Sequence, residues 1–219
     1  MLRDGNLAIF GPSTGISDGR HLGPDGASAL LGVPFDLFPR TTVRHVIVQD
    51  NGHPISRELP ASFTYGDSLP YGPTLVPGDR AVENAGGVPL GHATLCWFLH
   101  RTGLFLQEFG AGAAGNGRPG ERGAEDYGVL WSCALPLPSN LLRAAARHAG
   151  SHIWCEEDDV IYASASLVSL HSVKAGPRTV KFPRPCAPRD AVTAGCLGER
   201  LTELTVDVDP PMTKIWVMD

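Results

Sequence analysis

The sequence predicts an α/β domain followed by a small antiparallel β-domain. Residues 127–155 show a strand pattern, an amphipathic helix pattern and a second strand pattern, which is the order of a parallel α/β unit. From residue 160 onward the apolar runs are short and separated by turn residues, as in a β-sandwich. The acidic run 156–159 separates the two patterns. We therefore predict an α/β domain with long loops over 1–155 and a β-sandwich over 156–219.

The first elements are predicted from their apolar runs and from the residues that bound them. Leu7–Phe10 has the composition of a buried strand. A short helix is predicted over 24–31, because Pro24 stands at its start and Gly32 follows its end. A second strand is predicted at 43–49. Since a Rossmann-like domain normally has strands before this point, we expect the chain to begin partway through a domain.

The middle of the chain is dominated by turns, because Gly (26) and Pro (19) are abundant. Residues 50–91 have little periodicity over a length that is unusual for a loop, so short strands are expected within them. The apolar runs 93–101 and 104–109 predict a hairpin that turns at residues 102–103. A glycine-rich loop is predicted over 110–126.

The strongest helix signal follows the strand predicted at 127–133. Ser139 suits an N-cap and Gly150 suits the end of the helix. Its apolar face is predicted to comprise Leu141, Leu142, Ala145 and Ala149. Residues 152–155 are predicted as the next strand. The strands of the β-domain are predicted at 160–163, 166–171, 178–182, 203–208 and 213–217.

Charge and composition argue against several classes of protein. The net charge of -5 and a pI of about 5.9 argue against nucleic acid as a partner, because no basic stripe is present to displace counterions. No apolar run approaches the roughly 18–20 residues that cross a bilayer. The first residues lack the apolar core of a signal peptide. Five cysteines without metal-type spacing suit reduced thiols. We expect a soluble, cytoplasmic protein that does not contact a membrane.

Two features approach known cofactor or catalytic motifs, and each departs from its motif. Gly110, Gly112 and Gly115 have the spacing of a dinucleotide-binding loop, but no helix begins after them, so a surface loop is expected. Cys133 stands between a strand and a helix, where a nucleophile elbow would lie. The residues two positions away on either side are large, whereas an elbow needs small ones. A buried structural thiol is therefore expected.

The histidines and the acidic residues give no complete metal or catalytic set. His148 and His152 are four residues apart, but Gly150 between them is expected to end the helix. His92 and His100 have even spacing and could share one face, without a third ligand nearby. We therefore predict no metal site and no cofactor.

Two acidic features are expected to be structural. The run 156–159 is expected to be a solvated turn, because it lacks the alternating spacing of a calcium loop. Glu108 is expected to face outward from its strand or to pair with an arginine. No two carboxylates are placed together as glycoside hydrolysis requires, so no catalytic residue is assigned.

The segments that carry a family resemblance lie mainly in the second half of the chain: 135–139, 149–154, 158–163 and 171–180, together with His53–Arg57. They resemble the C-terminal portion of glycoside hydrolases of the beta-galactosidase type (clan A, family 42). In that family a catalytic TIM barrel is followed by an amidotransferase-like trimerisation domain and a small β-domain. The resemblance implies an incomplete flavodoxin-like domain followed by a β-sandwich. It also implies that the catalytic carboxylates lie in a barrel for which this chain has no room.

The resemblance predicts a non-catalytic assembly or accessory region of a glycoside-hydrolase-like protein, forming a homo-oligomer. Its possible partners are the missing TIM-barrel domain and a carbohydrate. Tyr65, Asp67 and Tyr71 lie in a polar segment and are the candidates for contact with a carbohydrate or a partner. Two alternatives remain open: a standalone carbohydrate-binding or protein-interaction module, and a small amidotransferase-like enzyme. Core packing is expected for the aromatic residues in strand-like runs, namely Trp97, Trp131, Trp154 and Tyr162.

Overall fold

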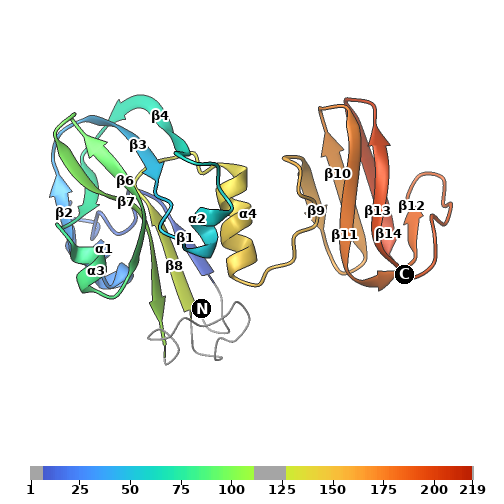
Figure 1. Ribbon diagram of the computed structural model, residues 1–219, viewed down its shortest axis with the longest axis horizontal. Helices are drawn as coiled ribbons and strands as arrows, with labels where there is room; N and C mark the ends of the chain where they lie inside the picture. The colour runs from blue at the N-terminus through green and yellow to red at the C-terminus, as the bar shows by residue number, and fades with distance from the viewer. Residues whose placement is uncertain (1–6, 111–126, 219) are drawn as a thin grey trace. The chain divides into compact units, whose positions relative to one another are not determined.

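The computed structural model describes residues 7–110 and 127–218, which form two compact units (Figure 1). The first unit ends at Ser151 and the second begins at His152, whereas the sequence placed the boundary after residue 155. Of the residues that the structure describes, 48% lie in strands and 13% in helices, so the fold is mostly β.

The first unit is built around a curled, mixed sheet of six strands in the order β1-β8-β7-β6-β3-β4 (Figure 1). Among the described strands, β1 and β8 form the one parallel pair, and the other neighbours in this sheet are antiparallel. A flavodoxin-like domain has a parallel sheet throughout, so that part of the prediction is not confirmed. The strands are β1 Leu7–Phe10, β3 Thr42–Val48, β4 Thr64–Tyr71, β6 Val88–Leu95, β7 Leu99–Phe109 and β8 Tyr127–Ser132.

The burial of successive residues explains why these runs form strands. Along β3 the buried and less buried side chains alternate, as they do in a strand with one face toward a core. In contrast, β8 is buried along almost its whole length, because it lies between β1 and β7 and is covered on both faces. The rings of Phe105 and Trp131 stack at the centre of this core with centroids 5.4 Å apart, and Phe35 meets the Trp131 ring edge-on.

Four helices and a two-stranded antiparallel ribbon accompany the described part of this sheet. The helices are α1 Asp25–Leu31, α2 Pro54–Arg57, α3 Ala81–Asn84 and α4 Ser139–His148, and the ribbon pairs β2 Phe35–Phe38 with β5 Thr74–Pro77. Helix α1 ends as predicted: Gly32 takes the left-handed conformation (φ 67°), and its N–H donates to the carbonyl of Ser28.

Helix α4 differs from the prediction in its cap and its buried face. Its N-cap is Pro138, which offers no side-chain acceptor, and Ser139 is already the first helical residue. Leu142 is 39% exposed, so the buried face is made instead by Leu141, Ala144 and Ala145. Residues 152–155, predicted as a strand, have no strand pairing. They follow the end of the first unit.

The hairpin between β6 and β7 turns at a different place from the predicted one. Leu95 pairs with Leu99, so residues 102–103 lie inside β7 rather than at the turn. A Cβ on Gly103 would lie 2.8 Å from the Cβ of Ala93, and the strand register shifts beside it. The glycine therefore marks a β-bulge with a close interstrand approach, which has the same local sequence signature as a turn.

The second unit is the β-sandwich predicted from the sequence. One sheet has the order β12-β14-β10-β9 and the other pairs β11 with β13, all antiparallel. Its strands are β9 Val160–Ala163, β10 Leu167–Ser172, β11 Gly176–Cys186, β12 Pro188–Asp190, β13 Leu201–Val208 and β14 Met212–Met218. Trp216 is 1% exposed and is the largest side chain of the core, which it shares with Val168, Leu170, Val180, Phe182, Cys186 and Val208.

Candidate functional site

The three predicted contact residues all lie on β4, an edge strand of the six-stranded sheet, but they have different surroundings. Tyr65 is 8% exposed and its hydroxyl is hydrogen-bonded to that of Ser132 at 2.8 Å, so it belongs to the core rather than to a polar loop. Burial raises the pKa of this hydroxyl. Asp67 is half-buried and its Oδ1 accepts the N–H of Leu69. Tyr71 is also half-buried. A surface contact is therefore compatible with Asp67 and Tyr71 only, and for these two it stays a prediction.

A buried arginine, which the sequence interpretation did not single out, lies against Tyr71. Arg44 is fully buried, its Nη1 donates to Thr74 Oγ1 at 2.8 Å, and its Cζ lies 3.0 Å from the centroid of the Tyr71 ring. Its Nε and Nη2 have no hydrogen-bond partner among the described residues. Burial lowers the pKa of the guanidinium, and Tyr71 and Cys133 partly oppose that shift. The alternation of β3 could have revealed it, since position 44 shares the inward face with Val46.

Cys133 and Cys155 do not have the surroundings of an activated nucleophile. Cys133 is 1% exposed, and burial raises the pKa of its thiol to about 12. Cys155 donates to Glu157 Oε2 at 2.9 Å, and burial together with this carboxylate raises its pKa to about 11. A catalytic thiol needs a lowered pKa, because the thiolate is the nucleophile. The thiols of Cys133 and Cys155 are thus protonated at neutral pH.

His148 and His152 belong to different units. His148, at the end of α4, has its Nε2 3.5 Å from Glu108 Oε1, and its ring centroid is 5.0 Å from that of His53. His152 belongs to the other unit, where its Nε2 is hydrogen-bonded to the carbonyl of Lys181. No group of three or more His, Cys, Asp or Glu among residues 7–110 and 127–218 is arranged to hold a metal ion. Glu108 thus lies beside His148.

His92 and His100 line one shallow hollow of about 430 Å³ over β6 and β7. His100 Nδ1 is hydrogen-bonded to Thr94 Oγ1 at 3.0 Å, whereas His92 Nδ1 and Arg101 Nε are buried and have no hydrogen-bond partner among the described residues. The lining is mostly polar and comprises Gln49, Glu83, Pro89, Gly91, His92, His100, Arg101 and Thr102. Such a hollow presents both hydrogen-bond donors and acceptors to a polar ligand.

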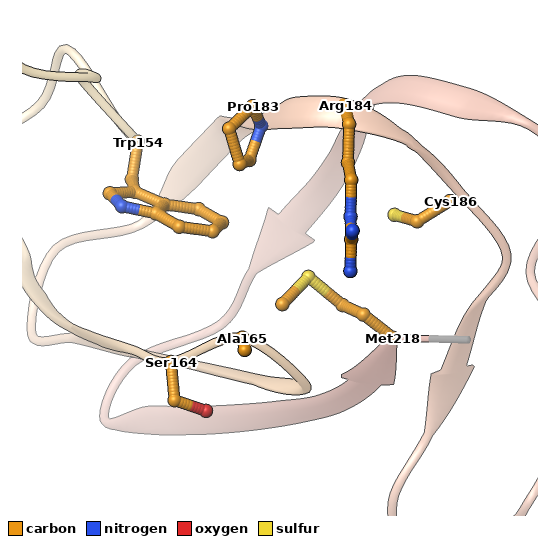
Figure 2. A pocket seen from close by; sticks show the side chains of 7 residues that line it. All are labelled: Trp154, Ser164, Ala165, Pro183, Arg184, Cys186 and Met218. Carbon is orange, nitrogen blue, oxygen red and sulfur yellow. The ribbon is translucent and has the colours of Figure 1, made fainter.

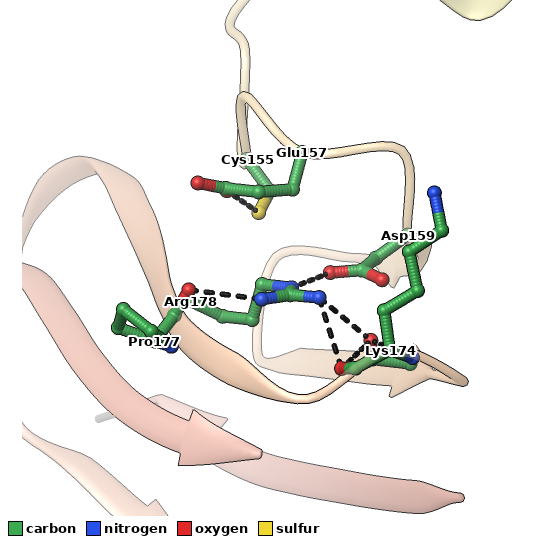
Figure 3. Close-up of polar contacts among 7 residues, drawn as sticks. Cys155, Glu157, Asp159, Lys174, Pro177 and Arg178 are labelled. Carbon is green, nitrogen blue, oxygen red and sulfur yellow. Dashed lines mark hydrogen bonds and ion pairs between the residues drawn. The ribbon is translucent and has the colours of Figure 1, made fainter. Parts of the chain in front are cut away.

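The acidic run 156–159 was expected to be a solvated turn, but one of its four side chains is buried. The side chain of Asp159 is 4% exposed and forms an ion pair with Arg178, whose side chain is 8% exposed (Figure 3). The guanidinium also donates to the carbonyls of Lys174 and Pro177 and to the hydroxyl of Ser172. This network ties the segment before β9 to the turn between β10 and β11. It is a structural cluster, since its donors and acceptors are used within the unit.

The second unit also has a mainly apolar pocket of about 230 Å³ (Figure 2). Figure 2 shows the Trp154 ring and the Arg184 guanidinium on two sides of the pocket, with the Met218 thioether between them. Its other lining residues are Ser164, Ala165, Pro183 and Cys186. Trp154 is partly buried: it packs against the core of this unit and also lines the pocket. Arg184 is exposed, and no described residue makes a hydrogen bond or ion pair with it.

Two of the aromatic residues expected in the core are exposed. Tyr162 is 71% exposed, and Trp97 is 96% exposed at the tip of the β6–β7 hairpin, next to Phe98 at 64%. Trp131 is fully buried, as expected. Of the dinucleotide-type glycines, Gly110 lies at the end of β7, while Gly112 and Gly115 lie outside the described residues. No helix of the described ranges is long and apolar enough to cross a membrane.

Comparison with known proteins gives a likeness of fold. The chain matches no protein-family model and no curated protein sequence. Among solved structures it is similar to the beta-galactosidase from Bacillus circulans sp. alkalophilus, with a TM-score of 0.56 and 10% sequence identity. The two chains have related folds. The likeness covers 100% of this chain and 30% of that one, so this chain spans less than a third of that protein's length.

Proposed function

We propose that this chain is a non-catalytic assembly and accessory region of a glycoside-hydrolase-related protein that acts on carbohydrates. The supporting observation is the fold likeness, which extends over the whole chain and over 30% of a beta-galactosidase. In this proposal residues 1–151 correspond to an amidotransferase-like domain of the beta-galactosidase type, and residues 152–219 to its terminal β-domain. The catalytic barrel is supplied by residues outside this sequence.

The surroundings of the reactive side chains support a non-catalytic role. An amidotransferase reaction needs a thiolate, but Cys133 is buried and its pKa is raised to about 12. Glycoside hydrolysis needs two carboxylates about 5–10 Å apart across a sugar-sized space. The two acidic features singled out by the sequence are engaged elsewhere, Asp159 with Arg178 and Glu108 beside His148. Both of these carboxylates are therefore used in contacts within the fold.

Assembly and activity of the purified chain test this proposal together. We expect light scattering to give one defined oligomer and assays with an aryl β-D-galactoside to give no hydrolysis. A monomer at every concentration from about 1 to 100 µM would contradict the assembly role, because association follows mass action. Release of ammonia from glutamine that disappears in Cys133→Ala would favour the amidotransferase-like alternative instead.

A second candidate, a carbohydrate-binding module, is favoured by the hollow lined by His92, His100 and Arg101. Its polar planar side chains and the two unpartnered nitrogens, His92 Nδ1 and Arg101 Nε, suit the hydroxyl groups of a sugar. On the edge strand β4, Asp67 and Tyr71 are proposed as further contacts with a carbohydrate or a partner. Calorimetric titration with D-galactose tests this candidate. A binding heat that is lost in Arg101→Ala would support this candidate. The absence of a binding heat up to about 10 mM D-galactose would contradict it, because millimolar or tighter binding would then be excluded.

A further inference from the structure

The tip of the β6–β7 hairpin is a fixed aromatic projection. Trp97 is 96% exposed and Phe98 is 64% exposed. Cys96 (φ 48°) and Trp97 (φ 67°) both adopt the left-handed conformation, which is rare for residues other than glycine. The turn is held to the sheet, since the N–H of Cys96 donates to Thr42 Oγ1 and that of Phe98 to the carbonyl of Leu95. Strained backbone that is held in place to expose an indole points to a binding role.

The pocket of the second unit is complementary to this aromatic tip in size and chemistry. Its volume of about 230 Å³ is below the range of roughly 300–1,000 Å³ typical of small-molecule sites, so it suits a single ring system. Trp154 is fixed on one side: its carbonyl accepts the N–H of Lys181, and its ring meets that of His152 edge-on. Arg184 lies exposed on the other side, and it makes no hydrogen bond or ion pair among the described residues. The aromatic, thioether and guanidinium groups around the pocket all pack favourably on an indole.

We infer that Trp97 of one copy of this chain inserts into the Trp154–Arg184 pocket of a second copy, and that the contact is reciprocal. This inference rests on the proposed assembly role and names the residues that would carry it. In the bound state the indole packs on the Trp154 ring and Pro183, and the Arg184 guanidinium lies over its face. Phe98 packs at the rim of the pocket.

Buried area favours a reciprocal pair over a single contact. An aromatic side chain buries about 150–250 Å², so the two aromatics of one tip and the surface they cover account for roughly 600–900 Å². That is the size of a crystal contact, whereas a stable interface buries about 1,200–2,000 Å². Two contacts related by a twofold axis reach this range, and a twofold axis requires each copy to provide both a tip and a pocket. Each chain carries both an aromatic tip and a pocket.

Light scattering and sedimentation of single variants test the inference. Trp97→Ala removes the tip and Ala165→Trp fills the pocket, and both are expected to convert a dimer into a monomer. Loss of a buried tryptophan anchor weakens each contact at least about 30-fold, so the dimer weakens on the order of 1,000-fold. Tyr162→Ala removes another exposed aromatic, outside the pocket, and is expected to leave the dimer intact.

The outcomes separate this inference from the proposed function. A wild-type oligomer that persists in both Trp97→Ala and Ala165→Trp would overturn the inference, while the assembly role would stand on another surface. A wild-type monomer would overturn both. Because Trp97 is exposed, its variant is expected to keep the wild-type circular dichroism, and Arg184→Ala gives a second exposed substitution that should weaken the dimer. Dissociation by Trp97→Ala with no effect of Ala165→Trp and Arg184→Ala would mean that the tip binds elsewhere, which also overturns the pocket assignment.

Discussion

Among the described residues each unit buries one arginine, and the two arginines have different polar surroundings. In the second unit, Arg178 faces the carboxylate of Asp159 and donates to two carbonyls and a hydroxyl as well. In the first unit, Arg44 is buried even more completely, yet it has one hydroxyl, Thr74, and one aromatic face, Tyr71. Two of its nitrogens have no partner among the described residues.

The difference follows from the sheets that surround the two side chains. Arg178 lies where an acidic segment and a turn meet, so carboxylate and carbonyl oxygens are at hand. Arg44 lies on the inward face of β3, between Thr42 and Val46, a face that turns toward the core of the first unit. One unit therefore holds a satisfied polar network, and the other holds a cation whose stabilisation comes mainly from a ring. Removing one polar partner or the arginine itself should therefore change the free energy of unfolding by different amounts in the two units.

The largest effect is expected from breaking the ion pair of the second unit. Asp159→Asn keeps the shape of the side chain but leaves Arg178 as an uncompensated buried charge. Such a change lowers the free energy of unfolding by about 3–5 kcal/mol. Urea denaturation measures the loss. Hydrogen exchange resolved by mass spectrometry should place it in β10 and β11.

Glu156→Gln is the matched control, because the Glu156–Lys181 pair lies in the same acidic run but is 44% exposed on both sides. Exposed pairs contribute about 0–1 kcal/mol, so this variant should be close to wild type. An equal loss of unfolding free energy in Asp159→Asn and Glu156→Gln would mean that the Arg178 network is solvated. Burial would then not explain the difference between the two units.

The next effect is a loss of stability of the first unit at alkaline pH. Burial raises the pKa of Cys133 from 9.0 to about 12, so the unfolded chain releases this proton first as the pH rises. The stability present below pH 9 is therefore lost progressively between pH 9 and 12, by about 1.4 kcal/mol per pH unit. Unfolding free energies measured under reducing conditions from pH 8 to 11 test this.

Cys133→Ala should remove this part of the alkaline slope, although the small cavity lowers stability at all pH values. In the second unit, the pKa of Cys155 is raised only to about 11, so the stability linked to this thiol is lost over a narrower pH range. An unchanged slope in Cys133→Ala would show that other groups, such as Tyr65, whose pKa burial also raises, dominate the alkaline loss.

The sequence predicted best the elements that depend on local pattern. The strands of the β-sandwich and the Gly32 end of α1 were found because alternation and punctuation lie within a few neighbouring residues. The prediction of a hairpin turn at 102–103 was wrong because it also used only neighbouring residues. A glycine required by a close approach to Ala93 has the same local signature as a glycine required by a turn, and only strand pairing separates them.

The candidate sites could be predicted less well, because they depend on contacts between distant residues. Asp159 and Arg178 are far apart in the sequence, so the acidic run gave no sign of a buried pair. Trp97 is a large apolar residue within an apolar run, which is typical of a core position. It is exposed because it lies at the tip of the hairpin. The pocket joins residues from Trp154 to Met218, which no short motif connects. In contrast, Arg44 could have been found, because its position in the alternation of β3 faces inward.

The smallest effect on stability is expected from Arg44→Met, and its comparison with Arg178→Met gives the sharpest contrast between the two units. Arg178→Met leaves Asp159 buried without a counter-ion and should lower the free energy of unfolding by about 3–5 kcal/mol. Arg44→Met removes a buried cation that has no carboxylate partner, and it leaves only the hydroxyl of Thr74 without its donor. Since burial already disfavours the charged form of Arg44, the apolar side chain should be neutral or stabilising, within about 1 kcal/mol of wild type. Thermal and urea unfolding of both variants measures the difference. A loss in Arg44→Met as large as that in Arg178→Met would show that the Tyr71 ring and one hydroxyl stabilise a buried guanidinium as well as a carboxylate does.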